Sequence, residues 1–157
     1  GKYDKLTEVR NSTYYYSMKR NRLPEKDFSV IILDANRLKF VNDTFGHQAG
    51  DEFIKTVAMA VTKSVLKQGS VYRIGGDEFI SIIKSSDENK IKGIVSEINK
   101  NLSESGKECE YPVSASVGYA VCTGEGDYEE ILKIADKRMY ENKTIYYIEN
   151  GIDRRRH

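Results

Sequence analysis

The chain has 157 residues, a hydrophobic fraction of 39% and a formal net charge of +1. This length suits one domain, and a charge so close to zero gives no reason to expect general affinity for nucleic acids. His47 and His157 are its two histidines, which nearly excludes serine–histidine, cysteine–histidine and multi-histidine zinc chemistry. Any catalysis therefore depends on carboxylates, lysines and metal ions.

The apolar runs are far shorter than the about 20 residues that a membrane span requires, and the polar N-terminus does not resemble a signal peptide. We therefore expect a cytoplasmic domain that makes no membrane contact, although it can be the cytoplasmic part of a membrane-bound sensor. Cys109 and Cys122 are too few for a disulfide framework. We expect both to be reduced thiols.

The first half of the chain predicts one strand among three helices. A polar, tyrosine-rich segment over residues 11–22 predicts a helix whose N-cap is residue 11 or 12. The compact apolar run over residues 28–33 predicts a buried strand. Residues 36–44 are predicted to form a short helix. After Gly46, apolar residues recur at helical spacing, at Ile54, Val57, Ala58, Val61 and Val65.

The second half begins with two strand-like segments, residues 70–74 and 79–84, on either side of Gly75-Gly76. Paired glycines favour a tight hairpin because they tolerate positive φ. A helix capped by Asp87, a strand, a helix and a final edge strand are then predicted over residues 87–102, 113–122, 128–142 and 145–148. This order predicts an α+β sandwich of the ferredoxin-like kind, with helices on one mostly antiparallel sheet of about five strands.

Three carboxylates stand where strands end or begin. Asp34 follows the first strand, and Asp77 and Glu78 follow the glycine pair. If the first strand lies beside the hairpin, Asp34 and Asp77 converge, and a buried carboxylate then requires a cation or a donor. Magnesium prefers such hard oxygen ligands. The pattern alone leaves a second interpretation open, in which Asp34 caps the following helix and the other two carboxylates lie on a turn.

The segment Arg73-Ile74-Gly75-Gly76-Asp77-Glu78-Phe79 resembles the signature of the GGDEF family of diguanylate cyclases. Other residues match the family's motifs in order and spacing: Asp4-Lys5-Leu6-Thr7, Asn11, Asp34, Lys39, Asn42-Asp43, Gly46-His47, Gly50-Asp51, Ala135-Asp136, Met139-Tyr140 and Lys143. The resemblance implies a nucleotidyl-cyclase-like fold. It also implies a single GGDEF domain over residues 1–157, with an N-terminal motif and helix over 1–25 and a catalytic core over 27–143.

The resemblance further implies the condensation of two GTP molecules into cyclic di-GMP and two pyrophosphates. In the family, the positions of Asp34, the Ala35 main-chain carbonyl and Asp77 hold two divalent ions, Mg²⁺ or Mn²⁺, on the GTP phosphates. The position of Asp77 is also often assigned as the base for the 3′-hydroxyl proton. Glu78 is expected to be a metal partner or an alternate base.

The resemblance assigns the remaining site residues to the substrate. Lys39 is implied to stabilise the transition state, Lys143 to bind phosphate, and the main-chain amides near Arg37 and Leu38 to cradle the phosphates. Each lysine has an ordinary alternative, Lys39 as a solvated helix residue and Lys143 as a cation at a helix C-terminus.

Base recognition is assigned to Asn42 and Asp51. A carboxylate can accept the paired hydrogen bonds that guanine, unlike adenine, offers. Asp51 can at the same time be a first-turn helix carboxylate.

Several positions depart from the family pattern. Glu8 and Val9 stand where glycine and leucine are common, Asn36 replaces a frequent aspartate, and Leu38 replaces a frequent aromatic residue. Tyr147 stands where a phosphate-binding arginine is expected, and Arg154, Arg155 and Arg156 lie further along. The Arg-x-x-Asp of the family's inhibitory product site is absent from residues 66–69, so we expect no such site.

One domain holds one GTP, so the resemblance implies a homodimer in which two domains face each other. We expect that an upstream sensory or dimerisation domain, absent from this chain, supplies this contact, and that the domain is excised from a longer sensor protein. Two alternatives remain open. The domain can bind GTP without turnover and regulate a partner, or it can be a structural interaction module that binds no GTP.

Overall fold

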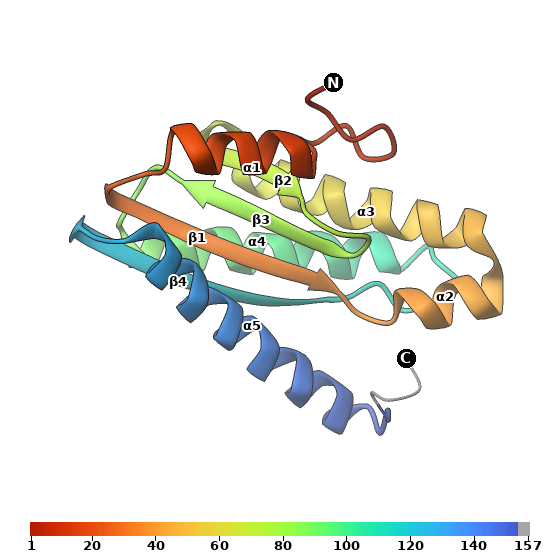
Figure 1. The fold of residues 1–157 in the computed structure, drawn as a ribbon. Coiled ribbons are helices and arrows are strands. Elements are labelled where there is room, and N and C mark those ends of the chain that lie inside the picture. Colours follow the sequence, from red (N-terminus) through yellow and green to blue (C-terminus); the bar gives the residue numbers. More distant parts are fainter. Residues whose placement is uncertain (154–157) are drawn as a thin grey trace.

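The computed structural model describes residues 1–153, so the expectations about Arg154, Arg155, Arg156 and His157 lie outside the described residues. A central sheet lies between two pairs of helices (Figure 1). The elements in chain order are α1 (Ser12–Asn21), β1 (Lys26–Ala35), α2 (Leu38–Phe45), α3 (His47–Val65), the short 3₁₀ helix η1 (Leu66–Gln68), β2 (Gly69–Arg73), β3 (Glu78–Ile83), α4 (Glu88–Gly106), β4 (Ala115–Glu125) and α5 (Tyr128–Glu149).

The strand order is β2-β3-β1-β4, and every neighbouring pair is antiparallel. This order confirms the predicted ferredoxin-like α+β sandwich. The prediction of about five strands is wrong, because the sheet of residues 1–153 has four. The expected edge strand over residues 145–148 is the last part of α5.

Residues 145–148 are helical because the side chains on one face of α5 are buried. Lys143 and Tyr147 are one turn apart, and both are buried on the side of α5 that also carries Met139. Isoleucine and tyrosine favour strands only where a pleated, half-buried surface receives them. Here the helix surface receives Tyr147 instead.

The hairpin between β2 and β3 forms as predicted, but for a different reason. Neither Gly75 nor Gly76 has a positive φ. A Cβ atom added to Gly76 would meet no heavy atom within 4 Å. The glycines therefore keep the surface of the turn free of side chains.

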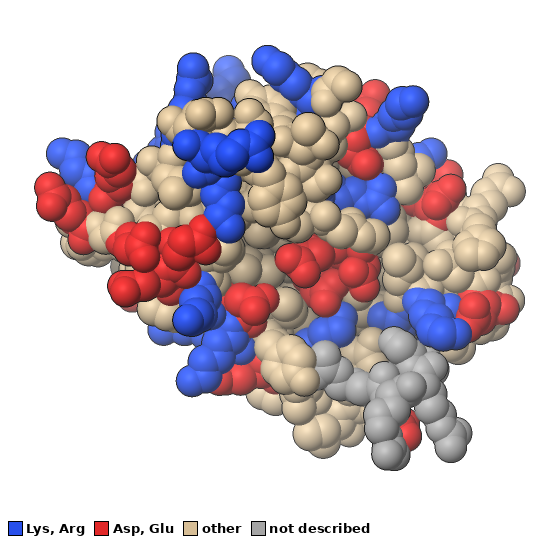
Figure 2. Space-filling view, viewed as in Figure 1, with Lys and Arg blue, Asp and Glu red and all other residues tan. Residues whose placement is uncertain are grey.

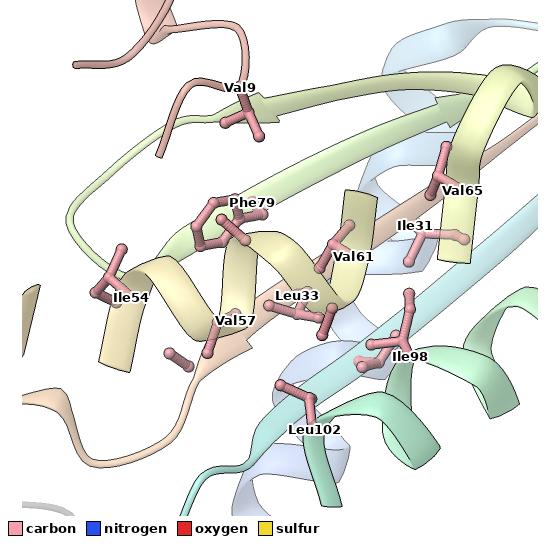
Figure 3. Packing of buried hydrophobic residues seen from close by; sticks show 14 of the residues in the cluster. Val9, Ile31, Leu33, Ile54, Val57, Val61, Val65, Phe79, Ile98 and Leu102 are labelled. Atoms are coloured by element: carbon pink, nitrogen blue, oxygen red, sulfur yellow. The ribbon is translucent and has the colours of Figure 1, made fainter. Parts of the chain in front are cut away.

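The two faces of the sheet carry separate hydrophobic clusters. Ile31 and Leu33 of β1 face α3 and α4, where they pack with Val57, Val61 and Ile98 (Figure 3). Val30 and Ile32, the alternate residues, face α1 and α5. Because β1 is covered on both faces, its sequence is a continuous apolar run and not an alternating one.

Helix α5 lies unusually close to the sheet. A side chain at Gly118 of β4 would collide with the backbone of Ala135 and Met139. The Asn142 side-chain amide also donates to the Val117 carbonyl at 2.7 Å. These contacts fix the height and rotation of α5 over the end of β1.

Two further expectations concern the cysteines and membrane-spanning helices. Cys109 and Cys122 are free thiols, as predicted. None of the helices within residues 1–153 combines the length and apolar character needed to cross a membrane.

Candidate active site

The end of β1 and the glycine turn are joined through backbone hydrogen bonds. Asp34 lies opposite Glu78 in the sheet register, and the Ala35 amide donates to the Asp77 carbonyl at 2.8 Å. Asp34 and Asp77 line the same pocket, and the Asp77 carboxylate is near enough to raise the pKa of Asp34. The convergence expected from the sequence is therefore present. The N-cap of α2 is Arg37, so the alternative in which Asp34 caps that helix is wrong.

Lys143 contacts Asp34 and Ala35 from the face of the sheet that α5 covers. Its Nζ lies 3.3 Å from Asp34 Oδ2 and 3.3 Å from the Ala35 carbonyl oxygen. The other oxygen, Asp34 Oδ1, is buried and has no hydrogen-bond partner within the described residues. A buried carboxylate oxygen without a donor is costly, so Lys143 satisfies the Asp34 carboxylate only in part.

Electrostatics at the site raise the pKa of two carboxyl groups. Burial raises the pKa of Asp34 to about 7, against the lowering effect of the Lys143 ammonium and with a further increase from the Asp77 carboxylate. Burial also raises the pKa of Glu78, assisted by the carboxylates of Asp136 and Asp77. Such shifts are common where carboxylates act in catalysis or bind metal.

A pocket of about 450 Å³ opens beside these groups. It is lined by Asp34, Ala35, Arg37, Leu38, Lys39, Asn42, Asp43, His47, Gly76, Asp77, Lys143 and Tyr147. Figure 2 shows acidic side chains gathered in a hollow at the middle of the face that is in view, with basic side chains directly below them. The pocket joins the first strand, α2, the glycine turn and α5 in one place.

The donors present fit a magnesium-type ion. No group of three or more His, Cys, Asp or Glu side chains within residues 1–153 is arranged to hold a metal by itself. Two carboxylates and a main-chain carbonyl, however, are the few hard oxygen ligands that Mg²⁺ takes from a protein when water and phosphate supply the others. The partnerless Asp34 Oδ1 agrees with such a ligand set.

Comparison with known proteins decides the family. The family model described as "Diguanylate cyclase, GGDEF domain" matches residues 1–146. The chain belongs to the GGDEF family. Diguanylate cyclase DosC of Escherichia coli is 31% identical over 146 residues, which cover 87% of this chain and 32% of DosC. Probable diguanylate cyclase DgcT of E. coli is 33% identical over 150 residues, which cover 89% and 33%.

This GGDEF chain therefore spans about a third of the length of these curated relatives. Solved GGDEF domains confirm its fold. The GGDEF domain of DgcB from Caulobacter crescentus, solved in complex with c-di-GMP, superimposes with a TM-score of 0.76 at 22% identity and covers 91% of this chain and 88% of that one. The FimX GGDEF domain from Pseudomonas aeruginosa gives 0.78 at 12% identity, with coverage of 92% and 94%.

The opening segment and the GGDEF signature are in direct contact. Arg73 Nη1 lies 3.1 Å from Asp4 Oδ2, and Arg73 Nη2 donates to the Gly76 carbonyl at 2.8 Å. Asp4 also accepts hydrogen bonds from the Thr7 amide and hydroxyl. The arginine before the signature therefore ties the N-terminal segment to the turn. Glu8, where the family commonly has glycine, has a φ of 66°, a conformation that glycine adopts at lower cost.

The residues expected to contact substrate are not all in the pocket. Arg37, Leu38, Lys39, Asn42 and Lys143 line it. Asp51 is exposed on α3 and does not line it. Its alternative as a first-turn carboxylate is wrong, because the first turn of α3 holds no acidic residue. Glu78 lies beside the pocket and lines a neighbouring hollow of about 710 Å³ together with Asp136.

Lys143 is not a lysine at a helix end. Helix α5 continues to Glu149, and Lys143 is only 9% exposed, so its alternative role at the helix C-terminus is wrong. Tyr147 forms part of the pocket wall where an arginine was expected. Asn36 lies outside the pocket, because its side chain bonds Ser114 and Ser116 of the segment at β4.

Asp43 and His47 match the family motifs, but sequence reasoning gave neither a role in the site, and both line the pocket. Asp43 accepts from Lys39 Nζ at 2.6 Å across one turn of α2. The spacing of four residues between a lysine and an aspartate could have indicated this pair. His47 begins α3 directly after α2, and only the turn at Gly46 brings it to the pocket.

Proposed function

We propose that this domain condenses two GTP molecules into cyclic di-GMP and releases two pyrophosphates. The observation that carries the proposal is the pairing of Asp34 with Asp77 beside an open pocket, with Asp34 Oδ1 left without a partner in the described chain. Membership in a family of diguanylate cyclases supports the same activity.

Asp34, the Ala35 carbonyl and Asp77 would hold two Mg²⁺ or Mn²⁺ ions, with Glu78 as a further partner. When bound, divalent ions polarise the α-phosphate and stabilise the leaving pyrophosphate. The carboxylates position these ions because β1 and the glycine turn are hydrogen-bonded to each other. This hydrogen bond, which holds the end of β1 beside the glycine turn, supports phosphate binding between Asp34 and Asp77.

Phosphate binding falls to the start of α2 and to two lysines. The amides near Arg37 and Leu38 open α2 and can donate to phosphate oxygens. Lys39 places its charge on the same side of the pocket and stabilises the charge that develops in the transition state. Lys143 supplies a second cation from α5.

Guanine selection rests on Asn42 and Asp51. Asn42 lines the pocket and offers both a donor and an acceptor to the purine edge. Asp51 accepts from the guanine N1–H and 2-amino groups, which adenine lacks as a pair. Asp51 lies outside the pocket wall, so this role requires the base to extend past α2 toward α3.

In the reaction, the 3′-hydroxyl of one GTP attacks the α-phosphorus of the other, and pyrophosphate leaves. Asp77 or Glu78 accepts the hydroxyl proton. The raised pKa of Glu78 makes it a stronger base than an ordinary glutamate. Both nucleotides must be held face to face, so the active species is a homodimer of domains.

Since the chain spans about a third of DosC and DgcT, we place it in a longer sensor protein whose other domain controls this dimerisation. The GGDEF domain itself then works in the cytoplasm and makes no contact with nucleic acid or membrane.

One observation favours a second candidate function. Tyr147 occupies the pocket wall where the family pattern has a phosphate-binding arginine. Loss of that cation can leave a domain that binds GTP without turnover and regulates a partner. The two candidates differ in product formation and not in GTP binding.

The deciding experiment fuses the domain to a parallel dimeric coiled coil and supplies GTP with Mg²⁺. We expect cyclic di-GMP and pyrophosphate, resolved by chromatography. Asp77→Ala should abolish product and leave the thermal unfolding midpoint nearly unchanged, because Asp77 lies on an open turn. Glu97→Ala, at an exposed site on α4, serves as the control and should retain full activity. GTP binding without product in the unmodified dimer would establish the regulatory alternative.

A further inference from the structure

Lys143 is held by three groups at the base of the pocket. Its Nζ lies 3.3 Å from Asp34 Oδ2, 3.3 Å from the Ala35 carbonyl oxygen and 5.7 Å from the centroid of the Tyr147 ring. The Lys143 side chain is only 11% exposed. Two of these three contacts are with the oxygen donors that the proposed function assigns to a divalent ion.

We propose that the Lys143 ammonium is a built-in counter-ion that occupies this cation position in the empty domain and leaves it when nucleotide binds. The inference rests on the proposed function, since it takes Asp34 and Ala35 as metal ligands. It adds that metal binding and nucleotide binding are coupled, because Lys143 contacts the metal ligands in the empty domain and the phosphates in the loaded domain. In the empty domain Lys143 neutralises Asp34, and in the loaded domain it serves the phosphates.

The contacts permit this exchange. Distances of 3.3 Å are long for charge-assisted hydrogen bonds, which are usually about 2.7–2.9 Å. The α5 backbone stays in place, because Asn142 is bonded to Val117 and the helix rests on Gly118. Only the flexible lysine stem has to turn, and it already lines the pocket together with Arg37 and Leu38.

Electrostatics require the exchange. A divalent ion bound to Asp34 and the Ala35 carbonyl would lie close to an ammonium that contacts the same carboxyl group, through Oδ2, and the same carbonyl oxygen. Repulsion between like charges at such separations is strong in a partly buried site. Phosphate oxygens give the ammonium an alternative partner, so nucleotide binding lowers the cost of admitting the metal. The coupling is reciprocal, so bound metal strengthens nucleotide binding by the same factor.

The test measures Mn²⁺ binding to the metal-free domain without nucleotide, by electron paramagnetic resonance of the free ion. We expect Lys143→Met to bind Mn²⁺ roughly tenfold more tightly than the unmodified domain. The same variant should bind a non-hydrolysable GTP analogue more weakly. These opposite effects distinguish counter-ion exchange from a structural role, because a damaged pocket would weaken both ligands.

Lys137→Met is the matched control. Lys137 is exposed on α5, six residues before Lys143, and its removal changes net charge equally. It should bind Mn²⁺ like the unmodified domain. If Lys143→Met fails to fold, Lys143→Gln removes the charge with a polar side chain and should show the same tightening.

Two outcomes would overturn the inference. Equal or weaker Mn²⁺ binding by the Lys143 variants refutes the counter-ion role alone, provided that the unmodified domain binds Mn²⁺ with the GTP analogue present. No Mn²⁺ binding by the unmodified domain, even with the analogue, refutes the proposed function as well.

Discussion

Asp34 is the residue in which burial and chemistry conflict most directly. It ends a strand that is buried on both faces, and its carboxyl group lies between Lys143 and Asp77. In the absence of metal, the charged form is disfavoured and its pKa rises to about 7. The unfolded chain has the ordinary, lower value, so the folded state holds this proton over a wider pH range.

This difference predicts a pH-dependent effect of Asp34→Asn. Because the folded-state pKa is raised, the Asp34 contribution to stability falls as the pH rises from about 4 to about 7. Without metal, Asp34→Asn should therefore gain stability relative to the unmodified domain between pH 5 and pH 8. Urea denaturation in EDTA at both pH values measures this difference. An unchanged difference would show that Asp34 titrates normally.

Gly50 shows a second constraint at the residue scale. A Cβ atom at Gly50 would overlap the Asn42 side-chain oxygen. The close packing of Asn42 over α3 is thus possible only because this position has no side chain. Asn42 and Gly50 are both among the matches to the GGDEF family motifs, and the structure gives the physical reason for their pairing.

We expect Gly50→Ala to displace Asn42 and weaken GTP binding by about 1 kcal/mol, the value of one hydrogen bond. Stability should change little, because alanine favours a helix and the Asn42 side chain can rotate away. Gly93→Ala is the control, since Gly93 lies in α4 with open space around it. Fluorescent-nucleotide titration measures both variants. Equal GTP affinities of the Gly50→Ala and Gly93→Ala variants would show that Gly50 does not position Asn42.

At the scale of elements, two tyrosines join α1 and α5, which cover the same face of the sheet. The hydroxyl groups of Tyr15 and Tyr128 lie 2.8 Å apart, and both side chains are almost fully buried. Burial raises the pKa of both hydroxyls, so they stay neutral and bond each other. This contact links the N-terminal helix to the helix that carries Lys143.

Tyr128→Phe should destabilise the domain by about 1–3 kcal/mol, because the Tyr15 hydroxyl is left buried without a partner. The double variant Tyr15→Phe/Tyr128→Phe should recover part of this loss, which a double-mutant cycle in urea would measure. Tyr16→Phe removes a hydroxyl from an exposed tyrosine of the same helix and should have little effect. Strictly additive losses would show that the two hydroxyls act independently.

The element scale also explains which structural predictions failed. The sequence patterns did not predict the 3₁₀ helix η1, but they located each α-helix and each strand of the sheet to within a few residues, except at residues 145–148. There the local composition favoured a strand, whereas α5 continued because Tyr147 packs on the same helix face as Lys143. Strand propensity depends on a partner strand, and sequence alone does not show whether one is available.

At the scale of the whole molecule, the proposed function makes the site one half of a reaction centre. Its residues come from β1, α2, the glycine turn, α5 and the first residue of α3, which are brought together at one end of the sheet (Figure 1). Helices α3 and α4 cover the face of the sheet that lies away from α1 and α5, and they contribute mainly to the core (Figure 3). The proposed reaction needs a second copy of this end, so its rate depends on what holds two domains together.

The sequence by itself determined the family, the order of elements up to the last helix and the convergence of Asp34 with Asp77. These follow from local signals, since strand ends, glycine turns and motif spacing are written in consecutive residues. Only the tertiary structure decided that Lys143 contacts Asp34 and the Ala35 carbonyl, that Asp51 lies outside the pocket and that Gly50 makes room for Asn42. Such contacts depend on the height and rotation at which helices pack, which are set by the whole core and not by any one segment.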